Sequence, residues 1–189
     1  MEFVPRFLTL PEQSFFLFGP RGTGKKTWLR QRLPEAIFVN PLRPEVYRKM
    51  ASRSERLGEV VRGDPAGRDV VVDEVQRAPE LLHVVHDLME QPSPPRFVLT
   101  GPSARKLRRG GIDLLAGRAV VRTLHPFLAA ELPTFDLERS LEIGLLSLVL
   151  DSAQPEDTLA AYANLYLEHE VQTEGWCAML ELSRASWKR

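Results

Sequence analysis

Residues 19 to 27, GPRGTGKKT, have the residue types and the spacing needed to hold a phosphate chain. Gly19, Gly24 and Lys25 match the P-loop pattern G-x-x-x-x-G-K-[ST]. Its glycines let backbone N–H groups approach phosphate oxygens, and its lysine reaches the β- and γ-phosphates. The strand-like run before the loop and the helical pattern after it disfavour the alternative of a chance glycine-rich turn. The pattern predicts nucleotide contacts along the whole segment, formed by Gly19, Pro20, Arg21, Gly22, Thr23, Gly24, Lys25, Lys26 and Thr27.

The residue after Lys25 departs from this pattern, because a hydroxyl there normally helps to hold Mg²⁺ and this chain has Lys26. An ammonium group cannot ligate a metal and would repel it, although it would still attract a triphosphate. Thr27 would replace the hydroxyl only if the helix began one residue later, since each residue turns a helical side chain by about 100°. The loop therefore predicts ATP binding and leaves metal-dependent hydrolysis open.

A second acidic motif, DVVVDEVQ at residues 69–76, complements the loop. Three valines indicate a buried strand that delivers Asp73 and Glu74 to the carboxyl edge of a sheet, where ligands bind in open parallel sheets. We expect Asp73 to hold Mg²⁺ and Glu74 to act as general base on the attacking water. Thr100 or Ser103, after the next strand, is a candidate sensor of the γ-phosphate. A hydroxyl that caps a helix beginning at Ser103 is the alternative.

These motifs need a parallel sheet to bring them together, and the chain predicts one. Apolar runs at residues 14–18, 36–40, 69–73, 96–100 and 118–124 read as strands. Helical patterns at 25–33, 45–61 and 78–90 lie between them, which indicates βαβ units in an α/β fold. Residues 91–95, QPSPP, predict a turn, and 135–150 and 156–172 predict helices. We place a core at residues 1–132, a helical extension at 133–175 and an atypical tail at 176–189.

Composition narrows the class of protein without naming it. Lys plus Arg and Asp plus Glu both number 25, so there is no overall basic excess for nucleic acid. The single Cys177 excludes an intrachain disulfide and fits a reducing cytoplasm. No secretory signal opens the chain, and no apolar run reaches the roughly 18 residues of a membrane span. We expect a cytoplasmic globular protein that does not enter the membrane.

Several stretches together resemble the AAA-type ATPases of the AAA_14 family, whose members usually carry a DUF4143 region at the C-terminus. The matching pieces are FFLFGPRGTGK, VVVDEVQRAPELLHVVHDLME, RFVLTGPSARKLRRGGIDLLAGRA and YANLYLEHEVQTEG. The resemblance covers about residues 1–175. It implies a five-stranded, mostly parallel P-loop NTPase core flanked by helices, with ATP and Mg²⁺ as ligands and with ATP hydrolysis.

The resemblance also implies that Arg118, in LLAGRA, is an arginine finger that reaches a neighbouring subunit's γ-phosphate in a homo-oligomer. A solvated arginine at the strand edge is the alternative. The basic cluster Arg105, Lys106, Arg108 and Arg109 could contact nucleic acid or a partner, although a solvated helical face is the commoner meaning. His83, His86, Asp87 and Glu90 lack a convincing set of zinc ligands, so we read them as a solvated helical face.

The chain departs from the family at Lys26, at Pro102 and in its tail, WCAMLELSRASWKR. One set of codons for residues 175–189, read two bases later, encodes LVRNAGAFSRFLEA, which resembles the family's continuation. We therefore hypothesise a frameshift near residues 174–176 that replaced the tail and removed the C-terminal half. Three interpretations stay open: an ATPase, a nucleotide-binding module that does not turn over because of Lys26, and a degenerate fragment.

Overall fold

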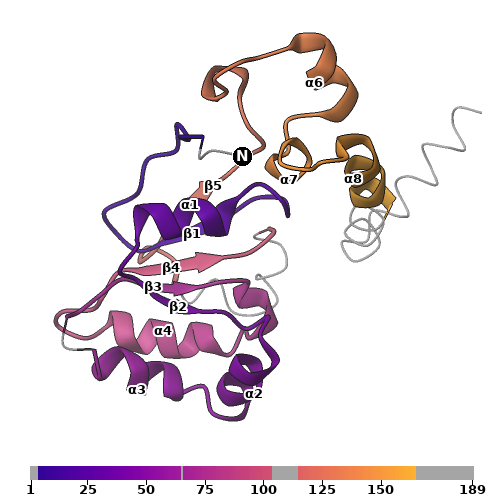
Figure 1. The fold of residues 1–189 in the computed structure, drawn as a ribbon. Helices are drawn as coiled ribbons and strands as arrows, with labels where there is room; N and C mark the ends of the chain where they lie inside the picture. The colour runs from indigo at the N-terminus through magenta and orange to yellow at the C-terminus, as the bar shows by residue number, and fades with distance from the viewer. Residues whose placement is uncertain (1–3, 65, 104–114, 165–189) are drawn as a thin grey trace, which may run out of the picture.

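A computed structural model describes residues 4–64, 66–103 and 115–164 of the chain. Its centre is a parallel sheet of five strands in the order β2-β3-β4-β1-β5 (Figure 1). The strands are β1 (Phe15–Phe18), β2 (Ile37–Val39), β3 (Val70–Val72), β4 (Phe97–Thr100) and β5 (Val120–Thr123). Each lies inside one of the five predicted apolar runs, which confirms the expected α/β fold.

The two faces of the sheet bury alternate side chains of the same strands, as the period of two along a strand requires. Phe15, Leu17 and Val98 pack against α1 (Lys25–Arg32), chiefly against Trp28 and Leu29. The opposite face carries the larger core, which contains β-strand residues such as Phe16 and Val72 together with residues of three helices. These are α2 (Pro44–Ser52), α3 (Arg56–Arg62) and α4 (Leu81–Met89), so the sheet lies between two helical layers (Figure 1).

Two of the predicted helical segments are each divided in the structure. Residues 45–61 form α2 and α3, separated by a short turn, and α4 is preceded by a 3₁₀ turn, η1 (Val75–Arg77). Residues 135–150 form α6 (Leu137–Ile143) and α7 (Ser147–Leu150). The chain breaks between them at Gly144, whose φ of 72° is left-handed and therefore favours glycine.

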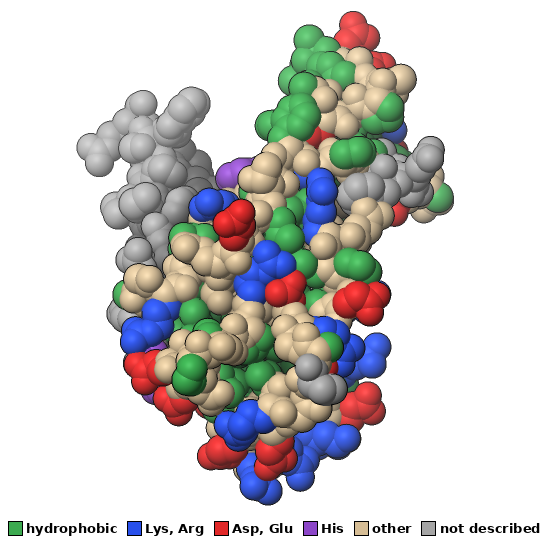
Figure 2. Space-filling view, turned by 90° about the vertical axis from the view of Figure 1, so that its left-hand side faces the viewer, with side chains coloured by type: hydrophobic (Ala, Val, Ile, Leu, Met, Phe, Trp, Pro, Cys, Tyr) green, Lys and Arg blue, Asp and Glu red, His purple; other side chains and the backbone are tan. Residues whose placement is uncertain are grey.

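The 3₁₀ turn η3 (Ala129–Glu131) lies between the sheet and α6. The last helix of the described residues is α8 (Pro155–Tyr162), which follows α7. Ile143, Leu146 and Val149 form a separate small core, against which Leu159 of α8 packs. Figure 2 shows hydrophobic side chains gathered at the top of the molecule, over the region of α6. The exposed apolar residues of this region include Phe135, Leu137 and Leu141.

Candidate functional site

The loop between β1 and α1 has the backbone geometry of a phosphate cradle. Gly19, Gly22 and Gly24 have φ values of 145°, 77° and 83°, in a region that side chains rarely allow. A Cβ at Gly19 would also lie 2.1 Å from the backbone oxygen of Leu124. Because α1 begins at Lys25, the loop ends where unpaired helical N–H groups and the helix dipole favour an anion.

Lys25 folds back onto this loop. Its Nζ donates to the carbonyl oxygens of Gly19 at 2.6 Å and Pro20 at 3.0 Å. Burial lowers the pKa of Lys25, while the nearby carboxylates of Glu74 and Asp73 act in the opposite direction. The lysine is thus buried in the loop, next to the acidic motif with which the sequence paired it.

Lys26 points from α1 to the acidic strand end, where its Nζ lies 3.6 Å from Oδ2 of Asp73. Asp73 is nearly buried, with 9% of its side chain exposed, and its Oδ1 accepts a hydrogen bond of 2.7 Å from Thr100 Oγ1. Both carboxylate oxygens therefore have partners. Thr27, at the next helical position, is exposed, and within the described residues its hydroxyl makes no hydrogen bond to Asp73.

The surroundings of Asp73 do not fit a magnesium ion. Asp73 supplies one carboxylate, but an ammonium stands where the pattern requires an oxygen ligand. A cavity of about 230 Å³ beside the pair is lined by Lys26, Arg30, Phe38, Asn40, Arg43, Val46 and Asp73. Three cations and one carboxylate line this cavity, so its lining attracts a polyanion more than a divalent cation. Among the described residues, no cluster of three or more His, Cys, Asp or Glu side chains could hold a metal.

Glu74 is held in an unusual backbone conformation beside this pair. Its φ of 56° is the only positive value at a non-glycine residue in the described ranges. Thr100 Oγ1 accepts a 3.0 Å hydrogen bond from the Glu74 N–H, and the Gln76 amide donates to Glu74 Oε2 at 2.5 Å. The Thr100 hydroxyl thus bridges both residues of the acidic motif. Left-handed residues of this kind gather at functional sites, where the surrounding structure stabilises them.

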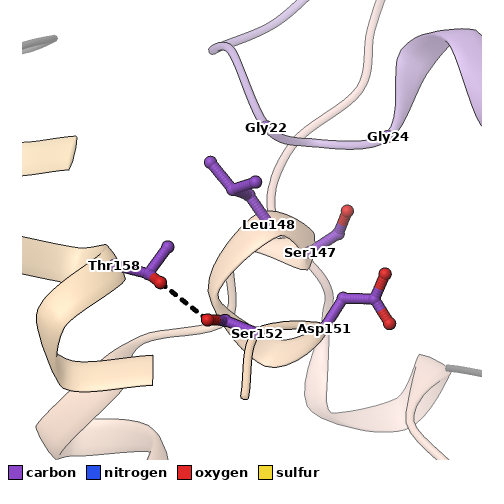
Figure 3. Close-up of a pocket in the computed structure, with 7 residues that line it drawn as sticks. All are labelled: Gly22, Gly24, Ser147, Leu148, Asp151, Ser152 and Thr158. Atoms are coloured by element: carbon purple, nitrogen blue, oxygen red, sulfur yellow. Dashed lines mark hydrogen bonds between the residues drawn. The ribbon is translucent and has the colours of Figure 1, made fainter. Parts of the chain in front are cut away.

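The helical extension reaches the loop through α7. The Leu148 N–H donates to the carbonyl oxygen of Gly22 at 2.9 Å, and Ser147 lies beside Gly24. Figure 3 shows Leu148 directed toward the Gly22 segment, and both residues line a pocket of about 420 Å³. The pocket is lined by Gly22, Gly24, Ser147, Leu148, Asp151, Ser152 and Thr158. No motif marked this contact, since α7 is a short apolar segment far from the loop in sequence.

Arg118 lies away from these residues. It lies two residues before the start of β5, which runs parallel to β1, so it sits at the amino-terminal edge of the sheet while the loop leaves the carboxyl-terminal edge. Its guanidinium donates to Glu90 Oε1 at 2.8 Å and is 41% exposed. It therefore cannot serve the site of its own subunit.

Other predicted residues take no part in the described site. His86 is half-buried and lies near the exposed carboxylates of Asp87 and Glu90 at the end of α4. The basic cluster Arg105, Lys106, Arg108 and Arg109, the helix expected after Ser103 and the tail at 176–189 lie outside the described residues. Ser103 itself is half-buried.

The family model of an AAA domain, AAA_14, matches residues 11–132, which include the loop and the acidic motif. The chain belongs to the AAA_14 family. Membership of this family supports a nucleotide-binding function of the ATPase type. A search of curated proteins found no match. None of the helices in the described ranges has the length and apolar character needed to cross a bilayer.

Among solved structures, the AAA domain is similar to the P-loop NTPase domain of the sigma-54 transport activator from E. coli. The two share 15% identity with a TM-score of 0.43, over 62% of this chain and 87% of that one.

Proposed function

We propose that this AAA domain binds ATP through the loop at residues 19–27 without depending on Mg²⁺, and that Lys26 suppresses metal-dependent hydrolysis. The observation that carries the proposal is the ion pair between Lys26 and Asp73, 3.6 Å apart. In this pair the Lys26 ammonium occupies the position beside Asp73 at which a metal ion would otherwise bind. The lysine then neutralises phosphate charge in the metal's stead.

The remaining residues of the loop serve binding in this proposal. Backbone N–H groups of the Gly22–Lys25 segment hold the phosphates, and Lys25 exchanges its contacts with Gly19 and Pro20 for phosphate oxygens. The positive field of the cavity beside Asp73 adds attraction for the polyphosphate. Thr27, which is exposed, contributes through its backbone alone.

The test is an ATP titration of the purified chain by calorimetry, once in EDTA and once in Mg²⁺. We expect the two dissociation constants to agree within about threefold, less than 0.7 kcal/mol. Lys25→Ala is the control, because it removes the buried ammonium that should contact phosphate, and it should weaken binding in both buffers. Binding that requires Mg²⁺ would contradict the proposal, and absence of binding by a folded chain would contradict any nucleotide site.

A second candidate function is ATP hydrolysis with Glu74 as general base, favoured by the constrained geometry of that residue. Its left-handed backbone and its bonds with Thr100 and Gln76 hold the carboxylate in one orientation beside Asp73. In this alternative Arg118 acts in trans, within a homo-oligomer. Turnover by the parent chain that Glu74→Gln abolishes, with ATP affinity retained, would establish it.

A further inference from the structure

Arg6 is a buried arginine upstream of the loop that belongs to no sequence motif. Its side chain is 5% exposed and its Nε donates to Glu131 Oε2 at 3.0 Å. Its two terminal nitrogens donate to three backbone carbonyls, those of Thr23, His125 and Pro126. The guanidinium also lies 4.3 Å from the ring centroid of Phe127. Arg6 thus joins the N-terminal segment, the loop and the segment after β5.

The contact with Thr23 bears on the nucleotide site because of peptide geometry. In a trans peptide the C=O and the following N–H point in opposite directions. Arg6 Nη1 donates to the Thr23 carbonyl at 3.2 Å, which turns the Gly24 N–H of the same peptide to the other side. Leu148 N–H does the same for the preceding peptide, where it holds the Gly22 carbonyl at 2.9 Å and turns the Thr23 N–H away.

The two N–H groups so directed have no acceptor within the described part of the chain. Successive N–H groups pointing to one side form an anion-binding concavity. The two carbonyls, if turned inward, would instead repel phosphate oxygens. Both carbonyls are secured by groups that lie outside the loop, Arg6 before it in the sequence and Leu148 after it.

We propose that Arg6 is a positioning residue of the nucleotide site, which together with the Leu148 N–H holds two consecutive loop peptides with their N–H groups toward the phosphates. This inference rests on the proposed ATP binding. It assigns a role in nucleotide affinity to a residue that touches no phosphate. It also makes the docking of α7 a condition for a fully formed cradle.

The first test compares Arg6→Lys with a matched control, Arg96→Lys. Arg96 also holds part of the N-terminal segment in place, since it pairs with Asp69 and donates to the Pro11 carbonyl at 2.7 Å. It directly precedes β4, however, and so lies at the edge of the sheet opposite to the nucleotide loop. A lysine keeps the positive charge at each position but loses the planar guanidinium, whose several N–H donors reach different acceptors at once. We expect Arg6→Lys to weaken binding of ADP and of ATP in EDTA by tenfold or more, and Arg96→Lys by about twofold or less.

Thermal unfolding of both variants separates affinity from folding. A folded Arg6→Lys that binds ATP within about twofold of the parent would overturn the inference, as would an equal loss in Arg96→Lys. Absence of binding by the parent chain would instead contradict the proposed function. The two failures are therefore distinguishable.

A second pair of variants applies even if Arg6→Lys does not fold. Leu148→Pro and Leu148→Ala both remove the leucine side chain, but only proline removes the N–H that holds Gly22. Proline is tolerated in the first turn of a helix, where Leu148 lies. We expect ATP affinity to be at least about threefold lower in Leu148→Pro than in Leu148→Ala, and equal affinities would overturn the role of this bond.

The parent chain supplies a third readout by NMR, without any substitution. Addition of ADP should shift the Thr23 and Gly24 amide resonances and slow their hydrogen exchange, because each N–H gains a phosphate acceptor. Binding that shifts other loop amides but leaves these two unchanged would overturn the inference.

Discussion

Lys26 Nζ lies 3.6 Å from Asp73 Oδ2, so the cation that departs from the P-loop pattern is paired with the carboxylate expected to hold the metal. Both residues were singled out by their types, one as an anomaly and the other as a metal ligand. Their proximity links the two observations. It also determines which substitutions of Lys26 should restore a metal-dependent site.

Replacement of Lys26 by threonine should make ATP binding depend on Mg²⁺. Lys26→Thr both frees Asp73 and supplies the missing hydroxyl, whereas Lys26→Gln frees Asp73 without a hydroxyl. We expect Mg²⁺ to raise the ATP affinity of Lys26→Thr by roughly tenfold, and that of Lys26→Gln by less. Steady-state phosphate release should show turnover in Lys26→Thr above that of the parent. Parent turnover equal to that of Lys26→Thr would contradict a suppressive role of Lys26.

Removal of the Thr100 hydroxyl should destabilise the fold. Thr100 is fully buried, and its Oγ1 serves both Asp73 and the Glu74 N–H. Thr100→Val keeps the shape but leaves a nearly buried carboxylate short of a donor, so we expect a loss of about 1–3 kcal/mol in the free energy of unfolding. Thr100→Ser, which retains the hydroxyl, is the control and should lose less. Equal urea midpoints for the two variants would show that the hydrogen bonds contribute little.

At Glu74, whose backbone is left-handed, we expect a glycine variant to be more stable than an alanine variant, the reverse of the usual order. At an ordinary helical position alanine is more stable than glycine by about 0.5–1 kcal/mol. Glu74 has a φ of 56°, where a Cβ costs roughly 1–2 kcal/mol, so Glu74→Gly should be more stable than Glu74→Ala. Both variants lose the carboxylate and its bond with Gln76, which cancels in the comparison. Chemical denaturation measures the difference, and a more stable alanine variant would exclude strain at this residue.

Acid should destabilise the fold by protonating Glu131, the carboxylate that pairs with Arg6. Burial opposes ionisation of Glu131, but hydrogen bonds from the Leu128 and Phe7 N–H groups and the charge of Arg6 lower its pKa from the ordinary 4.5. A lowered pKa means that the carboxylate stabilises the fold above pH 4.5, and that this contribution is lost as the pH falls through the folded-state value.

The measurement is the free energy of unfolding of the parent and of Glu131→Gln between pH 7 and pH 3. We expect Glu131→Gln to be less stable at pH 7 by about 1–3 kcal/mol, with the gap closing as the pH falls. Glu156→Gln is the control, because Glu156 also has a lowered pKa but is solvent-exposed in its pair with Arg139. Its effect should be smaller and should weaken with salt. A gap that stays constant with pH would exclude Glu131 as the titrating group.

The strands could be predicted from the sequence because each is a short, continuous apolar run, and such runs are stable only when both faces are covered. The divisions of the helical segments were harder to predict. No glycine or proline separates α2 from α3 between Ser52 and Arg56, so local signals gave no boundary there. Gly144 did mark the break between α6 and α7, but a single glycine is tolerated within many helices.

The sequence by itself determined the loop Gly19–Thr27 and the acidic pair Asp73 and Glu74, because phosphate binding and water activation need particular residue types at local spacings. Only the tertiary structure decided which groups hold them. Lys26 contacts Asp73, Arg6 holds the Thr23 carbonyl and Leu148 holds that of Gly22. These partners come from separate segments, and no pattern along the chain encodes the direction of a peptide carbonyl. That direction is a property of the packed loop, since each carbonyl turns toward whichever donor the fold brings beside it.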